Sequence, residues 1–134
     1  MEINDKKISV NKSNKAELKI IREFAESGDD CLVVMLNLNT YNDGAGFPNG
    51  SPYQDYTNAL EGLLLSVGGR IIFRSESLGQ GVGEQDIDEI LAAGYPSHQA
   101  FLDLPDDLGA RENSSFRKIC VKSALIRRFN GVLP

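Results

Sequence analysis

Residues 31–39 read Cys-Leu-Val-Val-Met-Leu-Asn-Leu-Asn and predict a strand that is apolar on both faces. Successive side chains of a strand point to opposite faces, so Val33 and Met35 share one face and Val34 and Leu36 share the other. A strand of this kind belongs in the middle of a sheet, covered above and below. We therefore expect residues 31–39 to be the central strand around which the chain is arranged.

Two asparagines, Asn37 and Asn39, interrupt the apolar run on one face of this strand only. A buried amide without hydrogen-bond partners costs roughly 1–3 kcal/mol. The two side chains are therefore expected either at the rim of the core or at the lip of a pocket.

Length and composition narrow the class of protein. The chain has 134 residues, a single-domain length, with 25% charged residues and a formal net charge of −5. Binding a phosphate backbone needs a basic patch, so we expect no nucleic-acid partner. No run reaches the ~18–20 apolar residues of a membrane span, and Met1–Val10 has no apolar signal segment. We therefore expect no membrane partner.

Capping and turn signals place the other elements. Asn14, with Glu17 three residues later, predicts the start of an amphipathic helix that ends near Ser27. Ser51 as N-cap, followed by Pro52, predicts the start of a second helix. The expected ranges from there on are helix 51–67, strand 70–78, strand 86–95, short helix 97–104, a helical turn within 113–118 and strand 119–129.

The order of these elements is one helix followed by β-α-β-β-α-β. This split pattern is typical of the ferredoxin-like α+β fold, an antiparallel sheet with both helices on one face. The first strand is central in that fold and pairs antiparallel to the last. The chain accordingly divides into an N-terminal extension with an extra amphipathic helix, residues 1–30, and a ferredoxin-like domain, residues 31–134.

The only two cysteines, Cys31 and Cys120, begin the first and the last of these strands. Antiparallel neighbours place them at opposite ends of the sheet, too far apart for a disulfide. The sequence shows no Cys or His spacing typical of zinc, so we expect no metal. Free thiols favour a reduced, cytoplasmic setting.

Five short motifs of the chain resemble one known family. They are Met35-Leu-Asn-Leu38, Gly68-Gly-Arg70, Asp88-Glu-Ile-Leu91, Tyr95-Pro-Ser97 and Ala100-Phe101. The resemblance covers residues 31–130 and points to small bacterial proteins classed as a domain of unknown function within the dimeric α/β-barrel superfamily. Related branches include cofactor-independent monooxygenases, muconolactone isomerases, stress-responsive barrel proteins and haem-binding members. The sequence has no haem-ligand motif, and we expect no cofactor.

The resemblance implies a homodimer in which two sheets pack face to face, with a ligand-sized cavity between sheet and helices in each subunit. The sequence is consistent with such a dimer, because Leu125 and Phe129 share a face of the last strand and the first strand is apolar on both faces. Apolar patches beyond a few hundred Å² are unusual on monomers, so we expect the open sheet face to be the interface. The N-terminal helix is expected across the rim of the barrel or on the partner subunit.

The best pocket candidates are Asn37 and Asn39 together with Tyr41, Tyr53 and Tyr56. Amide and phenol groups orient a polar aromatic or carbonyl ligand, while tyrosine rings supply apolar walls. The alternative is that Tyr53 and Tyr56 are core residues whose hydroxyls reach water.

Two arginines, Arg70 and Arg74, are expected on one face of strand 70–78. At a cavity mouth they would bind a substrate carboxylate. Otherwise they are solvated charges of an edge strand.

The only histidine, His98, is expected in the first turn of the short helix. It is a candidate for a general base beside the acidic stretch, where Asp88 and Glu89 are the other candidates for catalysis. The alternative is a surface residue dispensable to the fold, for which His98→Ala would change stability by less than ~0.5 kcal/mol.

Two functions remain open on this basis. One is a small dimeric α/β-barrel protein that binds a small organic ligand between sheet and helices. The alternative is a cofactor-independent monooxygenase or isomerase for a small aromatic or carbonyl substrate, which needs a titratable group inside the pocket.

Overall fold

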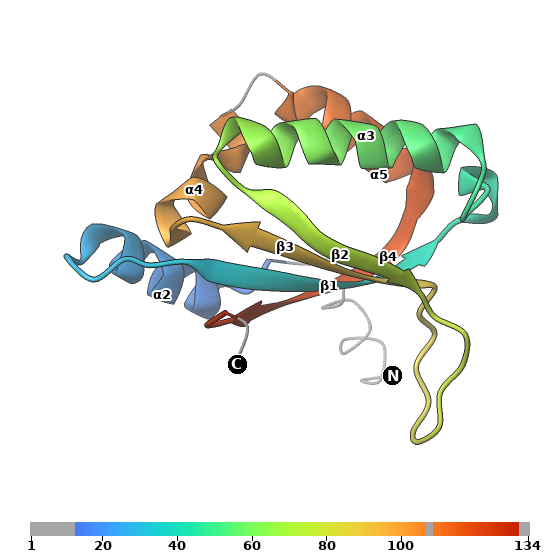
Figure 1. The fold of residues 1–134 in the computed structure, drawn as a ribbon, viewed down its shortest axis with the longest axis horizontal. Helices are drawn as coiled ribbons and strands as arrows, with labels where there is room; N and C mark the ends of the chain where they lie inside the picture. Colours follow the sequence, from blue (N-terminus) through green and yellow to red (C-terminus); the bar gives the residue numbers. More distant parts are fainter. Residues whose placement is uncertain (1–12, 107–108, 132–134) are drawn as a thin grey trace.

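The computed structural model describes residues 13–106 and 109–131, which form one four-stranded antiparallel sheet with its helices on one face (Figure 1). The strands are β1 Val33–Tyr41, β2 Arg70–Glu76, β3 Glu89–Tyr95 and β4 Val121–Phe129. The helices are α2 Lys15–Glu26, α3 Ser51–Ser66, α4 His98–Asp103 and α5 Ala110–Cys120, with 3-10 turns η2 Asp43–Ala45 and η3 Leu104–Asp106. No described helix has the length and apolar character needed to cross a membrane.

The strand order is β2-β3-β1-β4, and every neighbouring pair is antiparallel. Met35 at the middle of the sheet pairs with Ala93 of β3 on one side and with Arg128 of β4 on the other. The prediction of a central first strand that pairs with the last is therefore confirmed, and with it the ferredoxin-like α+β fold.

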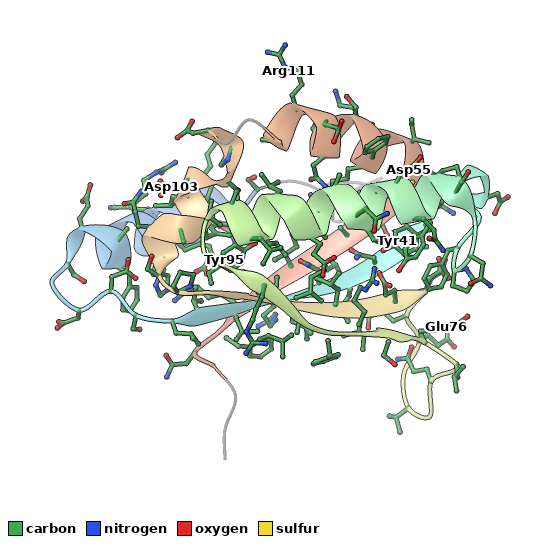
Figure 2. The ribbon with its side chains drawn as sticks, turned by 45° about the horizontal axis from the view of Figure 1, so that its top comes forward. Tyr41, Asp55, Glu76, Tyr95, Asp103 and Arg111 are labelled. Atoms are coloured by element: carbon green, nitrogen blue, oxygen red, sulfur yellow. The ribbon has the colours of Figure 1, made fainter. Side chains whose placement is uncertain are left out.

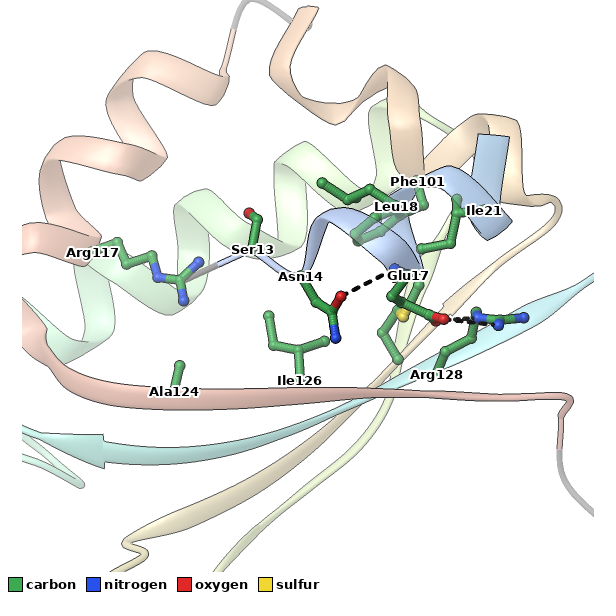
Figure 3. A pocket seen from close by; sticks show the side chains of 11 residues that line it. Ser13, Asn14, Glu17, Leu18, Ile21, Phe101, Arg117, Ala124, Ile126 and Arg128 are labelled. Carbon is green, nitrogen blue, oxygen red and sulfur yellow. Dashed lines mark hydrogen bonds and ion pairs between the residues drawn. The ribbon is translucent and has the colours of Figure 1, made fainter. Parts of the chain in front are cut away.

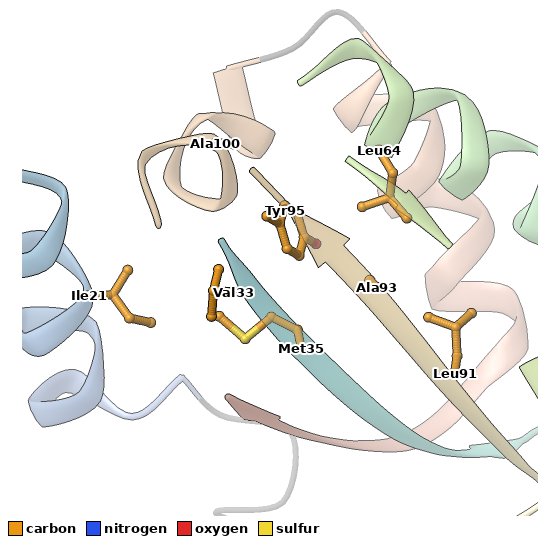
Figure 4. Close-up of a cluster of buried hydrophobic side chains, with 8 residues drawn as sticks. All are labelled: Ile21, Val33, Met35, Leu64, Leu91, Ala93, Tyr95 and Ala100. Atoms are coloured by element: carbon orange, nitrogen blue, oxygen red, sulfur yellow. The ribbon is translucent and has the colours of Figure 1, made fainter. Parts of the chain in front are cut away.

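One face of the sheet is covered by the helices and holds the core (Figure 4). Val33 and Met35 point to this face and are 1% and 3% exposed, and Leu64 of α3 is fully buried against the same cluster. Tyr41 and Tyr95 lie at opposite ends of the layer between α3 and the sheet, whereas Arg111 of α5 points away from it (Figure 2).

The N-terminal helix α2 lies at the end of this same helix layer, beside α4. Asn14 caps it by accepting a hydrogen bond from the Glu17 amide at 3.2 Å, as the sequence predicted. Ile21 is 2% exposed and belongs to the core cluster, while Glu17 forms a bidentate ion pair with Arg128 of β4. No described helix covers the opposite face of the sheet.

That opposite face, here called the open face, carries an apolar surface. Leu38 of β1 pairs with Leu125, and Val34 pairs with Phe129. Leu125 and Phe129 are 38% and 41% exposed, and Phe73 of β2 is 50% exposed.

A bulge in β2 overturns one sequence prediction. The register shifts between Ile71 and Phe73, so Arg70 pairs with Gly94 and points to the open face. Arg74 pairs with Leu91 and points to the helix face. The prediction that the two arginines share a face is wrong, because one extra residue in a strand reverses the alternation beyond it.

The helix boundaries needed two corrections. The N-cap of α3 is Gly50, and Ser51 is already the first helical residue. Helix α5 is a full helix from Ala110 to Cys120 where the sequence predicted one turn. Its inward side carries the polar Asn113 and Arg117 beside the buried Cys120, so apolar residues alone do not mark this side of the helix.

Candidate functional site

A cavity of about 520 Å³ lies between the sheet and the helices. Its floor includes Asn37 and Asn39 of β1, and its roof includes Tyr56 of α3 with Asn113 and Arg117 of α5. Cavities of this size are typical of small-molecule sites. The structure therefore brings three of the sequence candidates, Asn37, Asn39 and Tyr56, to one cavity.

The walls of the cavity are mostly apolar. They come from α2, α3, α4 and η3, namely Leu18, Leu60, Leu63, Phe101, Leu102 and Leu104. A smaller pocket of about 230 Å³ adjoins it beside α2 and shares Leu18, Arg117 and Ile126 with it (Figure 3). In a mostly apolar pocket, a small number of polar groups fixes the orientation of a bound molecule.

Two buried polar atoms of this cavity have no hydrogen-bond partner among the described residues. They are Oδ1 of Asn37 and Nδ2 of Asn113, whose residue is 9% exposed. More than nine in ten buried polar groups of folded proteins are paired, and an unpaired one costs roughly 1–3 kcal/mol. One acceptor on the floor and one donor on the roof thus lack a hydrogen-bond partner among the described residues.

The local structure explains how these groups meet. Asn37 and Asn39 are two residues apart on a strand and so point to the same face. Asn113 and Arg117 are four residues apart on α5 and so lie on one side of the helix. Because α5 packs over the sheet, the two pairs face each other across the cavity.

A second polar cluster, here called the Glu89 network, joins β1, α3, β2 and β3. The hydroxyls of Tyr41 and Tyr53 donate to the two carboxyl oxygens of Glu89, which is 3% exposed. Nδ2 of Asn39 donates to the Tyr41 hydroxyl at 3.3 Å, and Nη1 of Arg74 lies 3.4 Å from the Tyr53 hydroxyl. Both oxygens of this buried carboxyl group are therefore paired.

Aromatic packing holds the network in place. Phe47 of the loop after η2 stacks on Tyr41 with ring centroids 5.0 Å apart and meets Tyr53 edge-on at 4.9 Å. Gly50 allows this loop to close, because a Cβ there would lie 2.6 Å from the Gly46 Cα. Burial, reinforced by the hydrogen bond to Glu89, raises the pKa of both Tyr41 and Tyr53 above the usual value of 10.0.

The catalytic candidates lie outside the cavity. Glu89 lines a groove of about 330 Å³ between α3 and β2 with Tyr53 and Arg74. Oδ2 of Asp88 accepts the backbone amide of Tyr41 at 2.8 Å. In residues 13–106 and 109–131, no three His, Cys, Asp or Glu side chains are grouped as metal ligands.

The prediction that His98 is a surface residue is wrong. Its side chain is stacked on Phe24 of α2 at 4.8 Å, and the residue is 3% exposed. Nδ1 lies 2.9 Å from Oδ1 of Asp30, which also accepts the His98 backbone amide at 2.8 Å. The histidine therefore joins α2 to α4 and is not beside Asp88 and Glu89.

The structure places Arg70, a predicted ligand-binding residue, on the open face and outside the cavity. Sequence reasoning missed Asn113 and Arg117 as cavity residues. Their i, i+4 spacing was the available signal, but it fell in a stretch predicted to be mostly irregular. Both cysteines are free, with Cys31 exposed and Cys120 buried.

Comparison with known proteins supports the fold. No protein-family model matches the chain, and no curated protein matches it. A solved protein of unknown function from Rhodopseudomonas palustris is 23% identical, with a TM-score of 0.72 over 92% of this chain and 97% of that one. A dabb family protein with a ferredoxin-like fold from Mesorhizobium loti is 9% identical, with a TM-score of 0.52 over 77% and 99%.

A further solved structure is a dimeric ferredoxin-like protein of unknown function from Thermobifida fusca. It is 12% identical, with a TM-score of 0.51 over 78% of this chain and 94% of that one. Identities this low show the fold alone, so the function has to be argued from the site.

Proposed function

We propose that the protein binds a small organic ligand in the cavity between the sheet and its helices. The observation that carries the proposal is the pair of unpaired buried atoms, Oδ1 of Asn37 and Nδ2 of Asn113. Both lie in a mostly apolar cavity of about 520 Å³. A ligand with one donor and one acceptor would satisfy both atoms and remove the cost of leaving them unpaired.

We place binding ahead of the enzymatic alternative, a cofactor-independent monooxygenase or isomerase. That alternative needs a titratable group beside the ligand. Asp88, Glu89 and His98 are engaged in other contacts outside the cavity. Burial raises the pKa of Tyr56, which does line the cavity, so its hydroxyl stays protonated near neutral pH and does not act as a general base.

We propose further that two copies associate through the open face. Phe73, Leu125 and Phe129 leave 50%, 38% and 41% of their surface exposed there. A twofold contact would bury these side chains symmetrically. The Thermobifida fusca protein of this fold is described as dimeric. A cytoplasmic location is part of the same proposal and is supported by the two free thiols.

A thermal-shift screen of small aromatic and carbonyl compounds tests the binding proposal. Ile126 lines the cavity and is 48% exposed, so Ile126→Trp fills the cavity from its mouth without disturbing the core. Leu65→Trp is the matched control, because Leu65 is 61% exposed and lies outside the cavity lining. Compounds that raise the Tm of the wild type and of Leu65→Trp should not raise that of Ile126→Trp. Equal shifts in all three proteins would contradict the proposal.

Sedimentation equilibrium at micromolar concentration tests the association. The wild type is expected to sediment as a dimer, and Phe73→Glu as a monomer, because it places a charge in an apolar contact. Leu65→Glu, on the outer side of α3, should remain a dimer. A monomeric wild type would contradict the dimer and leave the cavity proposal standing.

A further inference from the structure

The charged residues around the cavity and its adjoining pocket are mainly arginines. Arg22, Arg117 and Arg128 line the two spaces, and among the described residues of their linings Glu17 is the only acidic one. Glu17 is already held by the bidentate ion pair with Arg128. This local excess of positive charge occurs in a chain whose formal net charge is −5.

Arg117 is the arginine positioned to contact a molecule inside the cavity. It is half-buried, lines both spaces, and its guanidinium extends over β4 toward Ser13 and Asn14 (Figure 3). Its side chain makes no hydrogen bond or ion pair with the residues that the structure describes. Arg22 has none either, but it is exposed and lies at the edge.

A half-buried guanidinium without a partner is unusual, because its five donors must be hydrogen-bonded when water is excluded. A carboxylate, sulfonate or phosphate oxygen pair fits its planar fork in a bidentate way. Partial burial strengthens such a contact relative to the same contact in water.

We infer that the ligand of this cavity is a small organic anion with an apolar body, and that Arg117 binds its acidic group. The inference rests on the proposed binding function and names its ligand class. Asn113, one turn before Arg117, donates to an oxygen of the ligand. Asn37 on the opposite side accepts from a hydroxyl or amine, and Leu60, Leu63 and Phe101 contact the apolar body.

Two fluorescent probes that differ in one group test the inference. Anilinonaphthalene sulfonate is an anion, and phenylnaphthylamine is the same ring system without the sulfonate. We expect the wild type to bind the anion at least about 10-fold more tightly. Arg117→Met should weaken the binding of the anion by about 10- to 100-fold, as expected for loss of a charge-assisted hydrogen bond. It should leave the affinity for phenylnaphthylamine unchanged. The unchanged probe also shows that the variant is folded.

Two variants serve as controls. Arg117→Lys keeps the charge and should retain part of the preference for the anion. Arg111→Met removes an exposed arginine of the same helix and should change neither probe. Equal affinities for both probes in the wild type, both lost in Ile126→Trp, would overturn the anion inference and support the cavity. Failure of both probes to bind, or full binding by Ile126→Trp, would overturn the proposed function as well.

Discussion

The interior of this protein contains two polar clusters that differ in how completely they are paired. In the Glu89 network, two tyrosine hydroxyls occupy both carboxyl oxygens. In the cavity, Asn37 and Asn113 each keep a buried atom that has no hydrogen-bond partner in the part of the chain that the structure describes. Asn37 and Asn39 belong to the same strand face, yet only Asn39 is tied into the network. This difference supports the proposal that the network serves the fold and that the cavity binds a ligand.

Removing the acceptor at the centre of the network should have the largest effect. Glu89→Ala leaves the buried hydroxyls of Tyr41 and Tyr53 without their acceptor and opens a gap between them. We expect a loss of roughly 2–5 kcal/mol in the free energy of unfolding, measured by urea denaturation. Glu89→Gln preserves the shape of the side chain and one acceptor oxygen, so its loss in the free energy of unfolding should be smaller. A loss below ~1 kcal/mol for Glu89→Ala would contradict the structural role of Glu89.

The contact between α2 and α4 should rank next. His98→Ala removes the stacking on Phe24 and a hydrogen bond to Asp30. We expect a loss of roughly 1–3 kcal/mol, in contrast to the small change predicted for a surface residue. Gln99→Ala, at the exposed neighbouring position, is the control and should stay within ~0.5 kcal/mol of wild type.

The burial of the tyrosines in both clusters should be detectable in an alkaline titration. All four tyrosines have a pKa raised above 10.0, mainly because burial disfavours the phenolate. The folded state then keeps protons that the unfolded state releases, so this contribution to stability is present below pH 10 and is lost as the pH rises further. We expect the ultraviolet phenolate signal to appear together with unfolding. A tyrosine that titrates near pH 10 in the folded protein would contradict the burial.

The smallest effect on stability is expected in the cavity. Asn37→Leu replaces an unpaired amide by an apolar group of similar size, which should leave the free energy of unfolding within ~1 kcal/mol of wild type or raise it. The same variant should lose ligand binding. Asn39→Leu is the matched comparison and should be destabilising, because it breaks the hydrogen bond to Tyr41. Equal losses in the free energy of unfolding for both variants would contradict the difference between the two clusters.

The fold was predictable from the sequence because it depends on strong local patterns. Residues 31–39 marked the central strand, and the caps at Asn14 and Ser97 marked two helix starts. These signals, taken in order, specify the split β-α-β arrangement.

The site was predictable only in part, because it depends on contacts between distant segments. Nothing local to His98 indicates that Phe24 and Asp30 will cover it. The bulge near Phe73 separates Arg70 from Arg74, and a single extra residue leaves no periodic trace. Asn113 and Arg117, which line the cavity, interrupt the apolar pattern of α5.

The central claim, that this cavity binds a ligand, is tested most directly by an NMR titration of the isotope-labelled protein with phenylnaphthylamine. The side-chain amide signals of Asn37 and Asn113 should both shift as the probe saturates the cavity. The amide of Asn58, exposed on α3, should not move. Shifts confined to Leu38, Phe73 and Leu125 on the open face, with Asn37 and Asn113 unchanged, would contradict the account.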